Sequence, residues 1–327
     1  KHYAYQVRLQ GGQVQQHRIE SMTDRRGHRV FLNEFEIVNG LSTGRVIRQT
    51  LADDTQIQIN YNHVDNGVVG TLVTEADGSR HRYVFDPNTP YLLSETTAYG
   101  TALAQTYTYQ RNAYGQLIAT VDPLLRRTQI DYDSAGRIEK VTALAGTSQA
   151  RSSRMGYSTD GRLSWVADDL DRKTKLEYTG ACLTKATGPL GRSAELVCDQ
   201  AGLLRKVIDP LGHATTLDYD GYELAAVVDA IGRRIEYKYD ALGRRVSVRD
   251  AEGNTVRTEY DVLDRPLKVF DASGRQVMGY VYDENGNVLA IQVVNGNGIT
   301  YTYDKLDRVE TRVDRLGQTE RWSYHPG

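Results

Sequence analysis

A Tyr-Asp pair recurs at a nearly constant interval from residue 132 onward. The pairs are Tyr132-Asp133, Tyr219-Asp220, Tyr239-Asp240, Tyr260-Asp261, Tyr282-Asp283 and Tyr303-Asp304. The last five lie 20, 21, 22 and 21 residues apart, and Cys198-Asp199 occupies the position 21 residues before Tyr219. A fixed period of this kind indicates a repeat architecture, in which each repeat is one small unit completed by its neighbours. No other feature of the sequence constrains the fold as strongly.

Two turn signals fall within each repeat, about ten residues apart. The first follows the Tyr, as in Asp-Ala-Leu-Gly at 240–243, and the second is typified by Asp-Ala-Glu-Gly at 250–253. Asp at the first turn position bonds its own downstream backbone, and Gly at the fourth accepts positive φ. Asp264 and Asp307 occupy two of the Gly positions, where Asp tolerates the left-handed conformation better than most residues.

Short alternating runs lie between the turns. At 234–239, Ile235, Tyr237 and Tyr239 fall on one side, and charged residues fall on the other. Such alternation, bounded by Asp and Gly, predicts antiparallel strands. Each repeat of about 21 residues is therefore expected to be one β-hairpin with two turns.

The sequence predicts an all-β protein, a long antiparallel ribbon of β-hairpin repeats with almost no helix. A lone hairpin is marginal in water, so neighbouring repeats should pair edge to edge, and strand twist should make the ribbon curl. We expect Tyr residues of successive repeats to stack as a ladder, and stability to be a sum of local terms. Residues 107–327 are interpreted as regular repeats and residues 1–106 as degenerate repeats of the same ribbon.

The repeat resembles that of the Rhs/YD-repeat family. The resemblance rests on Tyr-Asp-Ala-Leu-Gly-Arg at 239–244, Tyr-Asp-Ser-Ala-Gly-Arg at 132–137 and Asp-Pro-Leu-Gly at 209–212, and it covers residues 107–327 well and the rest weakly. It implies a β-ribbon that spirals into a hollow cocoon. Bacterial members, including Rhs effectors and the C component of Tc toxins, enclose a variable C-terminal toxin, and animal teneurins use a similar shell in adhesion.

By this resemblance the chain is expected to be an encapsulating shell segment of a bacterial Rhs-type toxin or effector, used in interbacterial competition. It would be made in the bacterial cytoplasm and secreted or delivered to a target cell. Its partners would be further repeats and an encapsulated C-terminal toxin domain of the parent protein, which this chain does not contain. Export by type VI secretion with a spike protein and a chaperone is also implied. The segment at 209–212 is interpreted as an ordinary turn, since His213 follows it rather than the Leu of the family's cleavage motif.

A second hypothesis remains open. Tyr supplies 22 of the aromatic residues, and Tyr rings interleaved with Arg can stack on sugars or bases. The chain could then be a carbohydrate- or cell-surface-binding adhesion module that uses its Tyr-rich sheet face. The balance of 40 basic and 42 acidic residues argues against a nucleic-acid surface, and no apolar run reaches the roughly 18 residues of a membrane span.

No catalytic, cofactor-binding or metal-binding residues are predicted, and the chain is not expected to be an enzyme. Most Asp residues are explained by turns, and the seven His residues do not form a His-Glu-x-x-His pattern. The residues singled out have structural roles. They are Tyr132, Asp133, Gly136, Tyr219, Asp220, Tyr239, Asp240, Gly243, Tyr260, Asp261, Tyr282, Asp283, Gly286, Tyr303 and Asp304.

The two cysteines are expected to be unlinked. Cys182 and Cys198 lie sixteen residues apart and match neither a metal-ligand spacing nor a disulfide framework. Because Cys198 stands in the position of a repeat Tyr, we expect it to pack as a small apolar residue. The fold should then be held together by strand pairing and burial alone.

Overall fold

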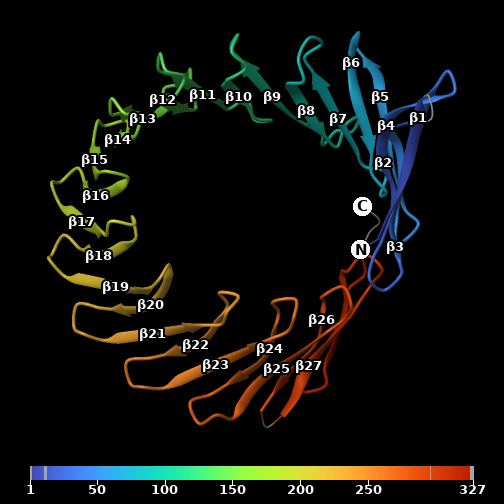
Figure 1. Ribbon diagram of the computed structural model, residues 1–327. Coiled ribbons are helices and arrows are strands. Elements are labelled where there is room, and N and C mark those ends of the chain that lie inside the picture. Colours follow the sequence, from blue (N-terminus) through green and yellow to red (C-terminus); the bar gives the residue numbers. More distant parts are fainter. Residues whose placement is uncertain (1, 11–12, 295, 325–327) are drawn as a thin grey trace. The chain divides into compact units, whose positions relative to one another are not determined.

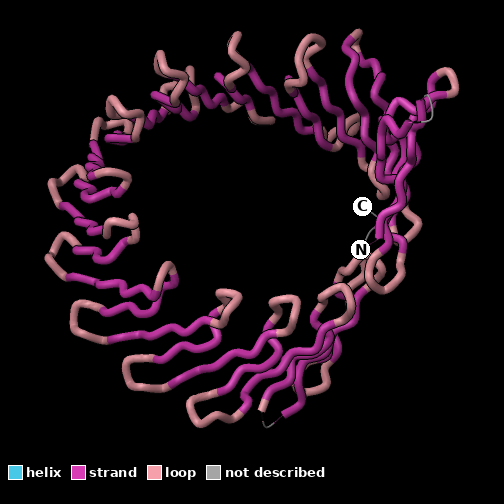
Figure 2. Tube along the Cα trace, viewed as in Figure 1, coloured by secondary structure: helices cyan, strands magenta, loops and turns pink. Residues whose placement is uncertain are grey.

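The computed structural model describes residues 2–10, 13–294 and 296–324. Among these residues every regular element is a β-strand, and strands alternate with turns without any helix (Figures 1 and 2). The 29 strands of this described part belong to one sheet, and every register that was determined is antiparallel. The prediction of an all-β antiparallel ribbon of hairpins is confirmed.

The strands become shorter after the first five. Strands β1 to β5 have nine to eleven residues, and the later ones have three to eight. Their bounds are β1 His2–Gln10, β2 Gln13–Thr23, β3 Arg29–Val38, β4 Leu41–Leu51, β5 Gln56–Asp65, β6 Val68–Thr74, β7 Arg80–Phe85, β8 Leu92–Thr97, β9 Gln105–Arg111, β10 Leu117–Val121, β11 Arg127–Tyr132, β12 Ile138–Ala143, β13 Arg151–Tyr157, β14 Leu163–Ala167, β15 Lys173–Thr179, β16 Cys182–Thr187, β17 Ser193–Cys198, β18 Leu204–Ile208, β19 Ala214–Asp220, β20 Glu223–Val228, β21 Arg234–Tyr239, β22 Arg245–Arg249, β23 Thr255–Tyr260, β24 Pro266–Phe270, β25 Gln276–Tyr282, β26 Val288–Val293, β27 Gly296–Tyr303, β28 Val309–Val313 and β29 Thr319–Arg321.

Contacts divide the chain into two compact units. The first contains residues 1–125 and 280–327, and the second contains residues 126–279. This division follows contacts in space, whereas the predicted boundary between residues 106 and 107 separates degenerate from regular repeats. That boundary stays a prediction.

Two kinds of turn alternate along the chain. Turns after odd-numbered strands are called A turns here, and they directly follow a Tyr after β11, β13, β21, β23, β25 and β27. Turns after even-numbered strands are called B turns. The strand pair joined by an A turn carries a β-bulge one step before the turn, between Lys238 and Tyr239 for example, and again between Glu259 and Tyr260. The pair β22–β23, joined by a B turn, keeps a regular register. Because a bulge bends its strand and increases twist, each repeat adds curvature at the same place.

The register gives the second unit two unlike faces. On one face, Leu217 lies opposite Val227, which lies opposite Ile235. On the other face, Asp218 lies opposite Ala226, which lies opposite Glu236. The line that contains Leu217 continues through the unit, and the face on which it lies is called the apolar face. This face also carries one charged residue, Arg151, at the start of β13. The interior positions of the apolar face are Ile130, Val141, Ser153, Met155, Val166, Thr174, Leu176, Ala186, Ala194, Leu196, Val207, Thr215, Leu217, Val227, Ile235, Tyr237, Val248, Val256, Thr258, Val269 and Met278.

The opposite, polar face carries charges of both signs. Glu177 lies opposite Lys185, which lies opposite Glu195, and further on Glu236 lies opposite Arg249. Opposite charges in directly facing positions stabilise a sheet modestly. The unit therefore has a mainly apolar side and a side with facing charges, on which Trp165 and Ala226 also lie.

No large side chain is fully buried among the described residues. The buried apolar residues of that part are small or medium in size, namely Ala52, Val84, Ala119, Ala167 and Ala226. The accessible surface is 21061 Å² for a mass of 36.7 kDa, against about 13,500 Å² expected for a compact globular protein of that mass. Stability must therefore come mainly from strand pairing and from contacts at the turns.

Candidate functional site, the A turn and its Tyr

The carboxylate that opens an A turn holds the whole turn. Asp240 accepts hydrogen bonds through Oδ1 from the amides of Leu242 and Arg244, at 2.9 and 3.1 Å. Its Oδ2 accepts from Arg244 Nε at 2.7 Å. The Arg244 guanidinium, together with these amides, holds the pKa of Asp240 below 3.8 despite the opposing effect of desolvation. The same arrangement occurs at Asp133, Asp261 and Asp304.

The turn arginine also contacts the Tyr at the end of the second strand after the turn. Arg244 forms an ion pair of 2.6 Å with Asp240, and its guanidinium lies 5.2 Å from the centre of the Tyr260 ring. This linked set is called the Asp–Arg–Tyr relay. Its members are Asp133–Arg137–Tyr157, Asp160–Arg162–Tyr178, Asp199–Arg205–Tyr219, Asp240–Arg244–Tyr260 and Asp304–Arg308–Tyr324.

The hydroxyl of the same Tyr bonds to the preceding strand, at the end of the hairpin opposite its B turn. Tyr260 donates to the carbonyl of Arg245 at 3.0 Å, and Tyr303 donates to that of Val288 at 2.9 Å. Tyr324 repeats the bond to Val309, at 2.7 Å. The predicted ladder of Tyr on Tyr is wrong at the relay positions, because an Arg from the preceding turn covers the ring there. A guanidinium over the ring adds a cation–π attraction to the contact. The positive charge is that of the Arg paired with the turn carboxylate.

The predicted repeat residues occupy recurrent places. Each Tyr among them ends a strand except Tyr219, which is the second-last residue of β19, and Gly136, Gly243 and Gly286 have φ of 79°, 75° and 102°. Asp264 and Asp307 show φ of 63° and 61°, which confirms the left-handed conformation expected at these Gly positions. The Tyr residues are Tyr132, Tyr219, Tyr239, Tyr260, Tyr282 and Tyr303, and the Asp residues that open four-residue A turns are Asp133, Asp240, Asp261, Asp283 and Asp304. Their role as determinants of the repeat stays a prediction.

Asp220 is placed differently. It is the last residue of β19 and pairs with Glu223 across a two-residue turn. Gly221 begins that turn with φ of 58°, which allows the tighter connection. Asp220 therefore opens no four-residue turn of the kind found at Asp240.

A second polar cluster joins turns that are far apart in the sequence but belong to the first unit. Arg26, from the turn between β2 and β3, lies 3.3 Å from Asp283 and 2.6 Å from Asp307. Asn285 donates to Asp24 at 2.7 Å, and Asp24 is only 4% exposed. These five residues are called the clasp. The clasp was not predicted from the sequence, because no periodic signal links residues about 260 positions apart.

The clasp lowers the pKa of a buried carboxyl. Burial alone would raise the pKa of Asp24, but hydrogen bonds from Asn285, the His28 amide and Arg26 bring it below 3.8. Burial also opposes ionisation of Asp283, whose pKa is lowered by Asn287, by turn amides and by the charge of Arg26. The contacts of the clasp therefore favour the ionised forms of Asp24 and Asp283.

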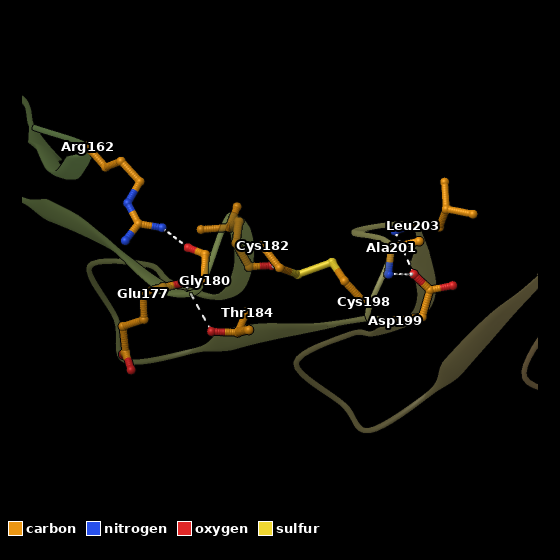
Figure 3. The surroundings of a disulfide bond; sticks show 10 residues. Arg162, Glu177, Gly180, Cys182, Thr184, Cys198, Asp199, Ala201 and Leu203 are labelled. Atoms are coloured by element: carbon orange, nitrogen blue, oxygen red, sulfur yellow. Dashed lines mark hydrogen bonds between the residues drawn. A yellow bond between two sulfur atoms is a disulfide. The ribbon is translucent and has the colours of Figure 1, made fainter. Parts of the chain in front are cut away.

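The expectation that the cysteines are unlinked is wrong. Cys182 and Cys198 form a disulfide with a Cα–Cα distance of 6.2 Å (Figure 3). In the register of β16 and β17, Lys185 lies opposite Glu195, so the residues three positions further out on both strands face each other. The pair follows from the sequence only if Gly188 is set opposite Arg192 around the turn, which brings residues 182 and 198 opposite each other. Cys198 is thus a cross-linked residue rather than a free apolar one.

Within the described residues, no group of three or more His, Cys, Asp or Glu side chains is placed to hold a metal ion. His213 instead lies 3.0 Å from the turn carboxylate of Asp209, and His63 lies 3.2 Å from the hydroxyl of Tyr99. In the same part of the chain, no helix is long and apolar enough to cross a membrane. The carboxylates with lowered pKa values at the A turns are explained by the turns themselves.

Comparison with known proteins gives one family match. The model of the RHS repeat matches residues 223–255, a stretch that contains the turns at 229–232, 240–243 and 250–253. No curated protein matches the chain.

Several solved structures match the chain at low similarity. The crystal structure of TcdB2-TccC3-Cdc42 has 15% identity and a TM-score of 0.41, with 95% of this chain and 22% of that chain covered. The Photorhabdus luminescens Tc holotoxin pore with a TccC3 mutation has 15% identity and a TM-score of 0.40, with 92% and 21% covered. The crystal structure of TcdB2-TccC3 has 14% identity and a TM-score of 0.38, with 95% and 23% covered. The chain spans less than a quarter of the length of these chains, and similarity at this level identifies no activity.

Proposed function

Because residues 223–255 match the RHS repeat and the Tyr-Asp period extends well beyond them, we propose that the chain belongs to the Rhs/YD-repeat family and is a wall segment of the encapsulating shell of a bacterial Rhs-type toxin or effector. The wall would sequester a C-terminal toxin domain of the parent protein, together with further repeats. The parent would be made in the bacterial cytoplasm and secreted or delivered to a target cell. It would act by sequestration, and its export with a spike protein and a chaperone in interbacterial competition remains part of the proposal.

The observation that carries the proposal is the two-faced single sheet of the second unit. A globular domain buries its apolar side in a core, but here a line of mainly apolar side chains, with some Ser and Thr among them, runs across fifteen strands, β11 to β25. Val256 on this face is 46% exposed and Ile235 is 39% exposed. Exposed apolar side chains on a sheet are typical of surfaces that bind another polypeptide, and this supports the proposal.

We assign the apolar face to the interior of the shell and the polar face to the outside. The polar face carries facing charges of both signs, which solvate well and do not favour association with other proteins. The apolar face offers contacts to a cargo in an incompletely folded state, whose own apolar side chains are exposed. Removing such surface from water is worth roughly 25 cal/mol per Å². The contacts would hold the cargo without requiring a specific sequence.

The adhesion hypothesis gains less support. Sugar recognition through Tyr requires an open ring face, and in the five relays an Arg guanidinium of the protein itself covers the ring. The Tyr hydroxyls at 260, 303 and 324 are also used in hairpin closure.

Limited proteolysis of the parent protein tests the proposal. We expect the toxin domain to survive protease when it is made in one chain with the repeats, and to be digested when it is made alone and kept unfolded. Equal digestion in the two samples would contradict encapsulation. Saturable binding of a glycan to the repeats, lost on substitution of exposed Tyr residues such as Tyr114 or Tyr222, would favour adhesion instead.

A further inference from the structure

The hairpin formed by β16 and β17 lacks the Asp–Arg–Tyr relay. The A turn before it is a two-residue turn in which Thr179 pairs with Cys182, so the position of the turn aspartate is Thr179. The strand that should end in Tyr ends in Cys198. In this hairpin the Asp of the relay is therefore replaced by Thr179 and the Tyr by Cys198.

The third part is replaced at the same spacing. In four hairpins the Arg that covers a Tyr ring stands sixteen residues before it; these are Arg45 with Tyr61, Arg162 with Tyr178, Arg244 with Tyr260 and Arg308 with Tyr324. Cys182 stands sixteen residues before Cys198. The disulfide thus occupies the Arg and Tyr positions of the relay, across the open end of a hairpin whose other end is the turn at 188–191.

We propose that the Cys182–Cys198 disulfide is a redox-controlled latch, which closes this hairpin covalently where other hairpins are closed by an Arg and a Tyr. In oxidising surroundings the hairpin is closed at both ends. Two equivalents of a thiol reductant, such as glutathione, open the latch by supplying two electrons and two protons. The products are two Cys thiols and one disulfide of the reductant.

The opening should be local. One relay ends at Tyr178 on β15, and the next begins at Asp199, directly after Cys198, and continues through Arg205 to Tyr219. Figure 3 shows the disulfide between these two neighbours, with Arg162 bonded to the carbonyl of Gly180 on one side and the Asp199 turn on the other. Reduction removes the closure of β16–β17 and leaves both flanking relays intact.

The chain contains a matched control. The hairpin β20–β21 also follows a two-residue A turn, and it has Glu223 sixteen residues before Tyr239. It has neither an Arg nor a Cys at these positions, so a reductant should leave it unchanged. The hairpin closed by Arg244 and Tyr260 is a second control, with an intact relay.

Hydrogen exchange of the whole chain, with and without a thiol reductant, tests the latch. A cross-link that closes a loop of this length restricts opening by up to about 100-fold. We therefore expect amides between residues 182 and 198 to exchange up to about 100-fold faster after reduction. Exchange at residues 223–239 and 244–260 should stay the same. Unchanged exchange at 182–198, or two free thiols in the oxidised chain by mass spectrometry, would overturn the proposal.

Two variants separate the latch from a general effect of cysteine loss. Cys182→Ser/Cys198→Ser should exchange like the reduced protein and should not respond to reductant. Cys182→Arg/Cys198→Tyr should restore slow exchange at 182–198 in the presence of reductant, because it rebuilds the Arg and Tyr of the relay. If this variant stays as open as the Ser variant, the disulfide does not replace the relay.

Discussion

At the scale of single residues, the turn aspartate combines three contacts in one side chain. Asp304 accepts from the amides of Leu306 and Arg308 at 2.9 and 3.0 Å, and from Arg308 Nε at 2.8 Å. Such bonds satisfy turn amides that strand pairing leaves free, and they place the Arg that stacks on the next Tyr. The residue therefore shapes the turn and connects it to the next repeat.

Asp304→Ala should destabilise the hairpin β27–β28 locally by roughly 1 to 2 kcal/mol, because turn amides and an Arg lose their acceptor. Asp220→Ala is the matched control, since Asp220 ends a strand beside a two-residue turn. We expect faster hydrogen exchange at 304–309 in the first variant and little change at 218–224 in the second. Similar changes in exchange rate at both sites would show that the Asp304 carboxylate contributes no more to its turn than Asp220 does.

Leu125 is a residue in a costly conformation. Its φ is 60° and its side chain is 84% exposed, so the left-handed backbone has no compensating burial. Leu125→Gly should raise the free energy of unfolding by up to about 1 kcal/mol. Its neighbour Leu124 is 72% exposed without positive φ, so Leu124→Gly should lower it. Chemical denaturation compares the two, and a loss of stability in both variants would refute the argument.

At the scale of elements, each hairpin is completed by a contact from the previous repeat. Tyr260 ends β23, its ring is covered by Arg244 from the turn before β22, and its hydroxyl reaches the first residue of β22. A β-bulge directly before Tyr260 turns the strand at this point. Because these contacts recur with the repeat, the stability of one hairpin depends on its neighbours and not on a distant core.

Substitutions at Tyr260 separate the two contacts. Tyr260→Phe removes the hydroxyl bond and keeps the ring under Arg244, so it should cost about 0.5 to 1.5 kcal/mol of local stability. Tyr260→Leu also loses the cation–π contact, which should add about 0.5 to 1 kcal/mol. Hydrogen exchange at β22 and β23 measures both. Equal effects of Phe and Leu would mean that the Arg contact contributes nothing.

Much of this element-scale structure could be predicted from the sequence. The period, the Asp and Gly turn positions and the alternation at 234–239 were sufficient for strands, turns and the left-handed Asp264 and Asp307. The relay was missed although Arg stands sixteen residues before Tyr in three of the five relays, because period-two reasoning compares neighbours within a strand. The disulfide was missed because Cys198 was interpreted from its Tyr position alone. The clasp depends on three-dimensional proximity between turns that share no repeat relation.

At the scale of the whole molecule, the first unit joins early and late parts of the chain through the clasp. Asp24 and Asp283 have pKa values below the ordinary value of 3.8. A lowered carboxyl pKa contributes stability above the unfolded pKa, and this contribution is lost as the pH falls through the folded value. The clasp should therefore be intact at neutral pH and weaken only below about pH 4.

Hydrogen exchange at 24–28 and 283–287, followed from pH 6 to pH 3 and corrected for intrinsic rates, measures this loss. The wild-type protein should lose protection at the acidic end. Asp24→Asn should show less protection at pH 6 and a smaller change with pH, since its side chain does not titrate. A variant as pH-dependent as the wild type would show that Asp24 is not the titrating group.

In the proposed shell, the apolar face of this sheet contacts an enclosed polypeptide. The most direct measurement places a photo-crosslinking residue in the parent protein at Val248 or at Ser247, adjacent half-buried positions of β22 on the apolar and the polar face. We expect crosslinks to the toxin domain from position 248 and few or none from position 247. Crosslinks mainly from 247, or none from either position, would contradict it.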